Sequence, residues 1–152
     1  MNQIVVVSPI GPLEIIEEKG AISFLKFGNT RSYVSEGTPL LKEAKEQLQN
    51  YFNRQSVDFD LPLAPAATLF QEKMRAYMLA IPAGETRSYG EAAEFLSSAP
   101  RSAGQACRLN PIPVIVPCHR IIAADGQLRG YSGGKGLQTK RFLLNLETKK
   151  TP

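Results

Sequence analysis

Short apolar segments dominate the N-terminal part of the chain. Residues 4–7, 13–17 and 22–27 are rich in Val, Ile, Leu and Phe. The sequences between them, Ser8-Pro9-Ile10-Gly11-Pro12 and Lys19-Gly20, are typical of turns because proline and glycine favour the backbone angles that turns require. The pattern therefore predicts three β-strands joined by short connections.

A different spacing begins at Thr38. From there to Phe52, apolar residues recur every three or four positions, which is the period of an α-helix. Thr38 is a favourable N-cap, and Pro39 suits the first helical position because its ring presets φ. The sequence therefore predicts an amphipathic helix with an apolar side made of Leu40, Leu41, Ala44, Leu48, Tyr51 and Phe52.

The stretch 59–67 contains prolines and indicates a short strand followed by a linker. We place a domain boundary here because the pattern changes from strands to helices on its two sides. The expected organisation is an N-terminal α/β domain, residues 1–65, followed by a C-terminal domain, residues 66–152.

The second part of the chain predicts helices. Residues 68–81 have one apolar side, and Pro82-Ala83-Gly84 ends that helix. Ser88 and Glu91 have the spacing of a capping box, which predicts a short helix over 89–96. After a break, residues 101–109 form another short helix rich in small residues. The two short helices fit a helix-turn-helix and fit an ordinary helical hairpin equally well.

The composition favours a folded protein and argues against a membrane-spanning or disordered one. Hydrophobic residues make up 43% of the 152 residues and charged residues 21%, which is sufficient for a folded core. The longest apolar runs are too short to span a bilayer, and the N-terminus has no secretion signal, so we expect a cytoplasmic protein. The formal charge of +4 permits a polyanionic partner without establishing one.

Cysteine and histidine are rare in this chain. Cys107 and Cys118 are the two cysteines, and His119 is the single histidine. This number is too small for a disulfide framework, and a structural zinc site usually needs four ligands. We therefore expect reduced thiols, no metal and no cofactor.

The segment 110–120, Asn-Pro-Ile-Pro-Val-Ile-Val-Pro-Cys-His-Arg, is the candidate chemical centre. Its three prolines restrict the backbone, so we expect a stiff, extended approach to Cys118. His119 and Arg120 are a base and a positive charge beside the thiol, and both raise the fraction of reactive thiolate. The same residues also fit a buried structural thiol beside a hydrogen-bonded histidine.

This segment closely resembles the active-site motif of the methylated-DNA–protein-cysteine methyltransferases, also called O6-alkylguanine-DNA alkyltransferases. Further segments of the chain are similar to the same family in the same order: residues 81–91, 130–134 and 143–147. The resemblance is strong from Thr68 to Glu147 and looser in the N-terminal part. It implies an α+β fold, in which a small ribonuclease H-like domain precedes a mainly helical domain with a helix-turn-helix and the active-site cysteine loop.

The family resemblance also implies a function. The protein is expected to repair double-stranded DNA by transferring the alkyl group of O6-alkylguanine, or of O4-alkylthymine, to Cys118. The thioether that forms is permanent, so each molecule acts once. A monomer is expected, without a cofactor.

The resemblance assigns the chemical roles to five residues. Cys118 is the alkyl acceptor, His119 relays its proton through water, and Glu147 polarises His119. Asn110 ties the helix-turn-helix to the active-site loop. Tyr89 donates a hydrogen bond to the flipped guanine as it leaves.

The resemblance also implies which residues bind the base and the duplex. Arg101 takes the place of the extruded base, and its helix lies in the minor groove. The remaining expected base contacts are made by Pro113, Tyr131, Ser132 and the main-chain carbonyls of Cys118 and Ile121. The remaining expected DNA contacts are made by Arg87, Ser102, Ala103 and Arg108.

The chain departs from some family members. It lacks the residues for an N-terminal zinc site, and Cys107 stands where some members have a larger residue against the guanine. Lys135-Gly136 lengthens the loop after Gly134. Two other functions remain open: a cysteine hydrolase, which would turn over, and a lesion-binding relative without chemistry, which would lack the acceptor cysteine that this chain has.

Overall fold

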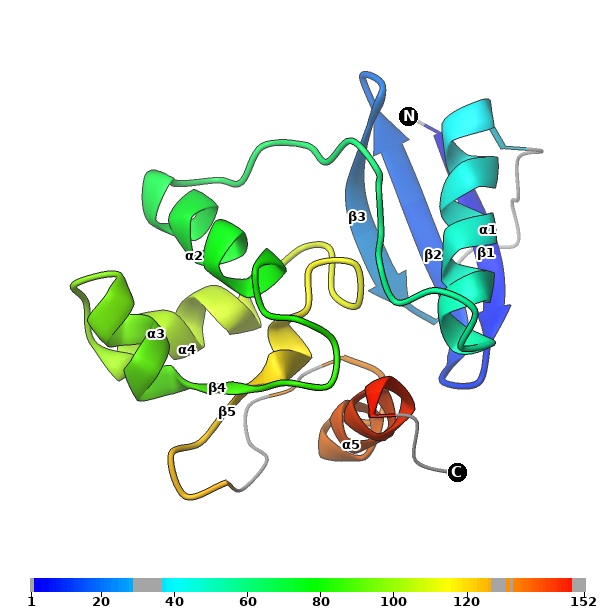
Figure 1. Ribbon diagram of the computed structural model, residues 1–152. Coiled ribbons are helices and arrows are strands. Elements are labelled where there is room, and N and C mark those ends of the chain that lie inside the picture. Colours follow the sequence, from blue (N-terminus) through cyan, green and yellow to red (C-terminus); the bar gives the residue numbers. More distant parts are fainter. Residues whose placement is uncertain (1, 29–36, 127–130, 132, 149–152) are drawn as a thin grey trace. The chain divides into compact units, whose positions relative to one another are not determined.

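The computed structural model describes residues 2–28, 37–126, 131 and 133–148 of the chain. The chain divides into two compact units, Met1–Pro65 and Ala66–Pro152. Among the described residues, strands and one helix form the first unit, and helices dominate the second (Figure 1).

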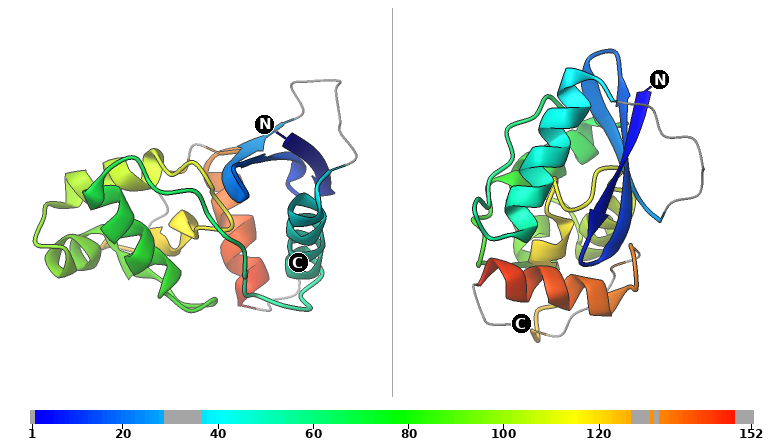
Figure 2. Two further views of the ribbon diagram at one scale, coloured as in Figure 1. Left: turned by 90° about the horizontal axis from the view of Figure 1, so that it is seen from above. Right: turned by 90° about the vertical axis from the view of Figure 1, so that its right-hand side faces the viewer.

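The first unit is an antiparallel sheet covered by one helix. Strands β1 (Asn2–Ser8), β2 (Gly11–Glu18) and β3 (Ala21–Phe27) are neighbours in that order. Helix α1 (Pro39–Phe52) lies along one face of the sheet (Figures 1 and 2). The three strands and the helix expected from the sequence are confirmed.

Local sequence explains where α1 begins. The Thr38 hydroxyl accepts a hydrogen bond from the Leu41 N–H at 3.2 Å, and Pro39 occupies the first turn. This cap satisfies one of the N–H groups that a helix start leaves without a partner. The residues that α1 buries follow the helical period: Leu41, Ala44, Leu48 and Tyr51.

The stretch after α1 forms one bridge instead of a full strand. Ile22 in β3 donates to the Pro62 carbonyl at 2.8 Å and accepts from the Ala64 N–H at 2.8 Å. The parallel bridge between Ile22 and Leu63 results. Pro62 has no N–H to donate, so the β-ladder between this stretch and β3 cannot extend through it.

In the described part of the second unit there are four α-helices, one turn of 3-10 helix and a small parallel sheet. The helices are α2 (Leu69–Leu79), α3 (Tyr89–Phe95), α4 (Pro100–Arg108) and α5 (Leu137–Glu147). Both capping-box hydrogen bonds are present at the start of α3, each 2.9 Å long between Ser88 and Glu91. The predicted boundaries of the first three helices agree with these within two residues at each end, and α5 contains the segment 143–147 that carries part of the family resemblance.

The small sheet joins two segments that are far apart in sequence. Strand β4 (Arg87–Ser88) pairs in parallel with β5 (Ile121–Ile122), with Arg87 opposite Ile121. The sequence did not predict this pair, because two residues are too few to show an alternating pattern. Its consequence is that Tyr89, the residue after β4, lies close to the chain that leaves Cys118.

These units together make the two-domain α+β fold expected from the sequence. No helix among the described residues is long and apolar enough to cross a membrane.

Candidate active site

Cys118 begins a single turn of 3-10 helix, η1 (Cys118–Arg120). The Arg120 N–H donates to the Pro117 carbonyl at 3.0 Å, and the Ile121 N–H donates to the Cys118 carbonyl. This turn is followed directly by β5 and contacts α5 (Figure 1). The Cys118 turn is therefore held between a strand and helix α5.

The approach to Cys118 is folded back on itself, and the expectation of an extended segment was wrong. The Val116 N–H donates a hydrogen bond to the Ile112 carbonyl at 2.8 Å. Pro113 and Val116 also form an isolated parallel β-bridge. The bend lies at Val114, whose φ is +72°. Each proline restricts its own φ and the residue before it, but Val114 and Ile115 precede no proline and are left to make the turn.

Asn110 fastens this bend. Its side-chain amide donates to the Val116 carbonyl at 2.9 Å, and its side-chain oxygen accepts from the Ile112 N–H at 3.1 Å. Its own N–H donates to the Cys107 carbonyl in the last turn of α4. One residue thus links α4 to the loop that carries Cys118.

The Cys118 side chain lies inside the unit, with the residue 7% exposed. Burial raises the pKa of the thiol, whereas the Asn110 side chain and the nearby Lys140 oppose that rise. The resting group is therefore a neutral thiol, and a base must take its proton before it can attack.

His119 is the candidate base in this turn. Its residue is fully buried, and its Nε2 lies 2.6 Å from the Glu147 carboxylate. The hydrogen bonds of His119 and Arg120 hold the pKa of Glu147 down to about 2, although burial alone would raise it. Because an ionised carboxylate only accepts, Nε2 carries the proton.

This tautomer leaves Nδ1 of His119 as an acceptor. Nδ1 is buried and has no hydrogen-bond partner among the described residues. Burial lowers the pKa of His119 below its ordinary value of 6.5 and outweighs the opposing effect of Glu147. The imidazole is therefore neutral near pH 7 and able to receive a proton at Nδ1.

Arg120, which the sequence analysis expected to act as a positive charge on the thiol, binds the Glu147 carboxylate. Its Nε and one terminal nitrogen donate to the two Glu147 oxygens at 2.8 and 2.9 Å, and the other terminal nitrogen donates to the Ile81 carbonyl at 2.6 Å. This paired geometry is the strong form of an arginine–carboxylate contact. Arg120 thereby fixes Glu147 and ties the end of α2 to the active-site turn.

Two tyrosines belong to the same neighbourhood. Tyr89 is partly exposed at the start of α3, and burial raises its pKa to about 12, with Cys107 and Cys118 adding to the rise. Tyr131 is 8% exposed, and burial followed by the nearby Cys118 raises its pKa. Both hydroxyls therefore stay protonated and remain donors at neutral pH.

The expected DNA-contact residues lie mostly on the outer side of α4. Arg101 and Arg108 are exposed at its two ends, and Ser102 is partly exposed. Ala103 is 0% exposed on the packed side of α4, so its side chain offers no surface to a duplex.

The remaining predicted residues are placed as follows. Arg87 is in β4 and pairs with Glu85 at 3.2 Å on the surface. Pro113 is partly exposed in the bend before Cys118, and Ile121 is buried in β5. Ser132 lies outside the described residues.

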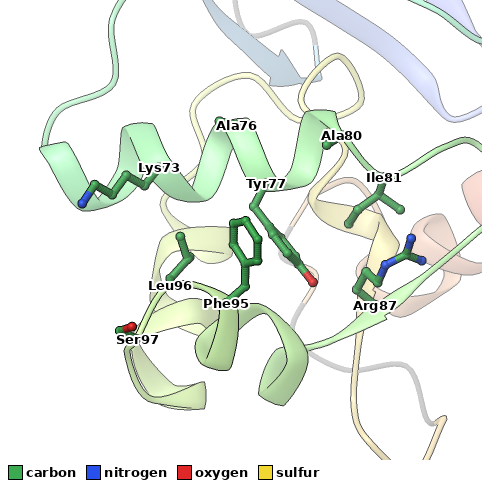
Figure 3. Close-up of a pocket in the computed structure, with 9 residues that line it drawn as sticks. All are labelled: Lys73, Ala76, Tyr77, Ala80, Ile81, Arg87, Phe95, Leu96 and Ser97. Carbon is green, nitrogen blue, oxygen red and sulfur yellow. The ribbon is translucent and has the colours of Figure 1, made fainter.

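A separate cavity of about 690 Å³ opens between α2 and α3. Figure 3 shows Tyr77 and Phe95 side by side in it, with Arg87 across from them; the two ring centroids are 5.2 Å apart. Its lining includes neither Cys118 nor His119, so this cavity is distinct from the Cys118 turn.

Both units match known families over most of their length. Residues 3–65 match the ribonuclease-like domain of 6-O-methylguanine DNA methyltransferase, and residues 69–149 match its DNA binding domain.

Individual relatives agree. The methylated-DNA–protein-cysteine methyltransferase of Methanosarcina acetivorans is 39% identical over 148 residues, which cover 92% of this chain and 94% of that protein. The constitutive methylated-DNA–protein-cysteine methyltransferase of Bacillus subtilis is 41% identical over 152 residues, covering 92% and 91%.

Solved structures give the same result. The structure of Mycobacterium tuberculosis OGT in complex with DNA superposes with a TM-score of 0.88 at 38% identity, covering 100% of this chain and 96% of that chain. An O6-methylguanine DNA methyltransferase from Methanococcus jannaschii superposes with a TM-score of 0.70 at 26% identity, covering 98% and 95%.

Proposed function

The chain belongs to the 6-O-methylguanine DNA methyltransferase family, and we propose that it repairs alkylated DNA by moving the alkyl group of O6-alkylguanine onto Cys118. We propose O4-alkylthymine as a second substrate of the same chemistry. The observation that carries the proposal is the Cys118 turn, in which a thiol is followed by a buried histidine bound to an ionised carboxylate.

The reaction begins with loss of the thiol proton. A water between Cys118 and Nδ1 of His119 passes the proton to the imidazole, which the Glu147 carboxylate stabilises in its charged form. The thiolate sulfur then bonds to the alkyl carbon as the bond from that carbon to O6 of guanine breaks. The electron pair of the broken bond stays on guanine.

Tyr89 acts on the guanine side of the displacement. Its protonated hydroxyl donates to the leaving base, which takes up a proton and departs neutral. Tyr89 then regains a proton from solvent, and the proton on His119 is lost to solvent. In sum, the thiol loses one proton to solvent, guanine gains one that solvent replaces on Tyr89, and the alkyl group moves from O6 to sulfur.

The base-binding and DNA-binding roles follow the family. Pro113, Tyr131, Ser132 and the carbonyls of Cys118 and Ile121 line the base site. The second helix of a helix-turn-helix formed by α3 and α4 enters the minor groove, where Arg101 fills the gap left by the flipped base. The exposed positions of Arg101, Ser102 and Arg108 support this role, with Arg87 as a further backbone contact.

A thioether does not hydrolyse, which separates this proposal from a cysteine hydrolase. Each molecule therefore acts once, as a methylated-DNA–[protein]-cysteine S-methyltransferase. We further propose that it works as a monomer without metal or cofactor in the cytoplasm, a compartment in which its two free cysteines stay reduced.

A titration tests the stoichiometry. Increasing amounts of duplex DNA with O6-methylguanine are added to a fixed amount of protein, and the lesions repaired are counted by chromatography of the digested DNA. The proposal predicts a plateau at one lesion per protein molecule. Continued repair beyond that plateau would identify a turnover enzyme and exclude self-alkylation.

A further inference from the structure

The cavity of about 690 Å³ between α2 and α3, here called the α2–α3 pocket, is apolar in its centre and has a cation on each side. Tyr77 from α2 and Phe95 from α3 form the centre, with their ring centroids 5.2 Å apart and the ring planes inclined by 42°. Figure 3 shows Lys73 and Arg87 on opposite sides of these two rings. Among the described residues that line the pocket, none is a carboxylate.

The apolar side chains of the pocket are more exposed than folding alone explains. Phe95 is 73% exposed at the end of α3, and the Tyr77 ring packs against part of it. Ala76 and Ala80 of α2 are also exposed beside these rings. A contiguous group of exposed apolar side chains is typical of a binding surface, whereas single exposed apolar residues are ordinary. The volume also falls within the range of about 300–1,000 Å³ that is usual for ligand pockets.

The two cations select the kind of partner. Lys73 is exposed, and the Arg87 side chain is 34% exposed. Arg87 donates to the Glu85 carboxylate at 3.2 Å and to the Thr86 carbonyl at 2.9 Å. Because an ion pair at the surface contributes little, Arg87 can exchange Glu85 for the carboxylate of a partner. An apolar centre between two cations is complementary to a large apolar side chain between two carboxylates.

We propose that the α2–α3 pocket docks an acidic peptide segment of a partner protein. A large apolar side chain of that segment packs on the Tyr77 and Phe95 rings, and acidic residues on its two sides pair with Lys73 and Arg87. The inference goes beyond alkyl transfer and does not depend on it, because the pocket is separate from the Cys118 turn. A partner bound here leaves the proposed active site open.

Duplex DNA is a poorer match for this pocket. The residues of α4 that are proposed to enter the minor groove do not line it. A duplex presents phosphates on its outside and keeps the faces of its bases stacked, so the exposed Phe95 ring would face charged groups. Arg87 is also proposed as a contact to the DNA backbone. The experiment therefore changes Lys73 and Phe95, which have no part in the proposed repair reaction.

The experiment measures peptide binding by fluorescence polarisation. The probe is a fluorescein-labelled peptide of sequence DDLFDD with blocked ends, which should bind saturably with a dissociation constant below about 1 mM. The peptide NNLFNN has no charges, and DDAADD has no large apolar side chain. Each of these two should bind about tenfold or more weakly, because the pocket uses both kinds of contact. Added salt should weaken DDLFDD and leave NNLFNN unchanged.

Variants of the protein locate the binding. Phe95→Ala removes the exposed ring, and Lys73→Glu reverses one of the two charges. Each should weaken DDLFDD about tenfold or more. Phe24→Ala, which removes an exposed ring from β3, and Lys42→Glu, which reverses an exposed charge on α1, are the matched controls and should bind as the unaltered protein does. Circular dichroism and thermal unfolding show whether each variant is folded.

Three results would overturn the inference: no saturable binding of DDLFDD, equal affinity for DDLFDD and NNLFNN, or unchanged affinity in both Phe95→Ala and Lys73→Glu. The same variants are tested with undamaged duplex DNA. If they weaken duplex binding and the protein does not bind DDLFDD, the pocket belongs to nucleic acid. A protein that binds DDLFDD and repairs no O6-methylguanine would contradict the proposed function and leave the docking site standing.

Discussion

At the scale of single residues, Glu147 makes the buried hydrogen bonds and ion pair that contribute most to the stability of the site. Its carboxylate receives hydrogen bonds from His119 and from two nitrogens of Arg120, and its side chain is fully buried. Removing one partner of a buried ion pair leaves the other charge without compensation, which costs more than the pair itself contributes. Glu147 therefore stabilises the fold as well as orienting the base.

This arrangement predicts a pH-dependent loss of stability in Glu147→Gln. The variant should unfold with a free energy about 3 kcal/mol smaller at pH 7, because Arg120 stays buried without its counter-ion. The folded pKa of Glu147 lies near 2, below its ordinary 4.5, so its contribution is complete above about pH 4.5 and is lost as the pH falls toward 2. Urea unfolding at several pH values measures the difference.

The difference between the two proteins should therefore shrink as the pH drops below about 4.5. Glu94→Gln, which removes an exposed carboxylate of α3, is the control and should change stability little at any pH. A difference between Glu147→Gln and the unaltered protein that is independent of pH would contradict this assignment.

At the scale of elements, local signals were predictable and non-local ones were not. The capping box at Ser88 and the cap at Thr38 lie within a few residues of the helices they start, so the sequence predicts them directly. The β4–β5 pair joins segments separated by more than thirty positions and has no local pattern. It nevertheless places Tyr89 beside the turn that carries Cys118.

Two features of the site, the burial of charged residues and the bend at Val114, could not be predicted from the sequence for physical reasons. Lys140 and Arg120 are charged residues, and charged residues are usually solvated, so their burial could not be assumed. The helical spacing of Lys140, Leu143 and Glu147 was the available signal. The bend at Val114 was missed because the prolines around it suggested an extended chain, whereas the Asn110 side chain holds a turn.

The position of Arg101 at the start of α4 predicts a substrate-dependent defect. If it fills the gap left by a flipped base, Arg101→Ala should slow repair of duplex DNA by about tenfold or more, since each lost contact of this kind costs about 1–3 kcal/mol. Reaction with free O6-methylguanine needs no base extrusion and should be unaffected. Single-turnover rates with both substrates provide the measurement.

Lys42→Ala removes an exposed positive charge from α1 and controls for the change in net charge. It should leave both rates unchanged. Equal losses on the duplex and on the free base in Arg101→Ala would remove that residue from the proposed role.

At the scale of the whole molecule, the sequence predicted the family and the two-part α+β architecture, because the motifs occur in order along the second unit. The packing around Cys118 was not predictable. The thiol is enclosed by residues from separate elements, and its neighbours include the buried Ile121 and Tyr131. A site packed so closely has little room for an added group.

Alkylation of Cys118 should therefore destabilise the folded protein. An inserted methylene in a packed interior typically costs about 1–3 kcal/mol. For a unit of this size, each kcal/mol lowers the melting temperature by about 4–8 °C, so the methylated protein should melt several degrees lower. Thermal unfolding before and after reaction measures the change, and Cys118→Ser treated in the same way should show none. A melting temperature that stays constant or rises on methylation would indicate spare volume beside the thiol.

The central claim is that Cys118 itself receives the alkyl group. The most direct measurement mixes the protein with duplex DNA that carries O6-methylguanine with a labelled methyl group, digests the protein, and locates the label by mass spectrometry. The two cysteines provide a matched pair of variants, Cys118→Ser and Cys107→Ser. The account predicts one label per molecule on the peptide containing Cys118, retained in Cys107→Ser and absent in Cys118→Ser. Label released as methanol, or found on Cys107 or any other residue, would contradict it.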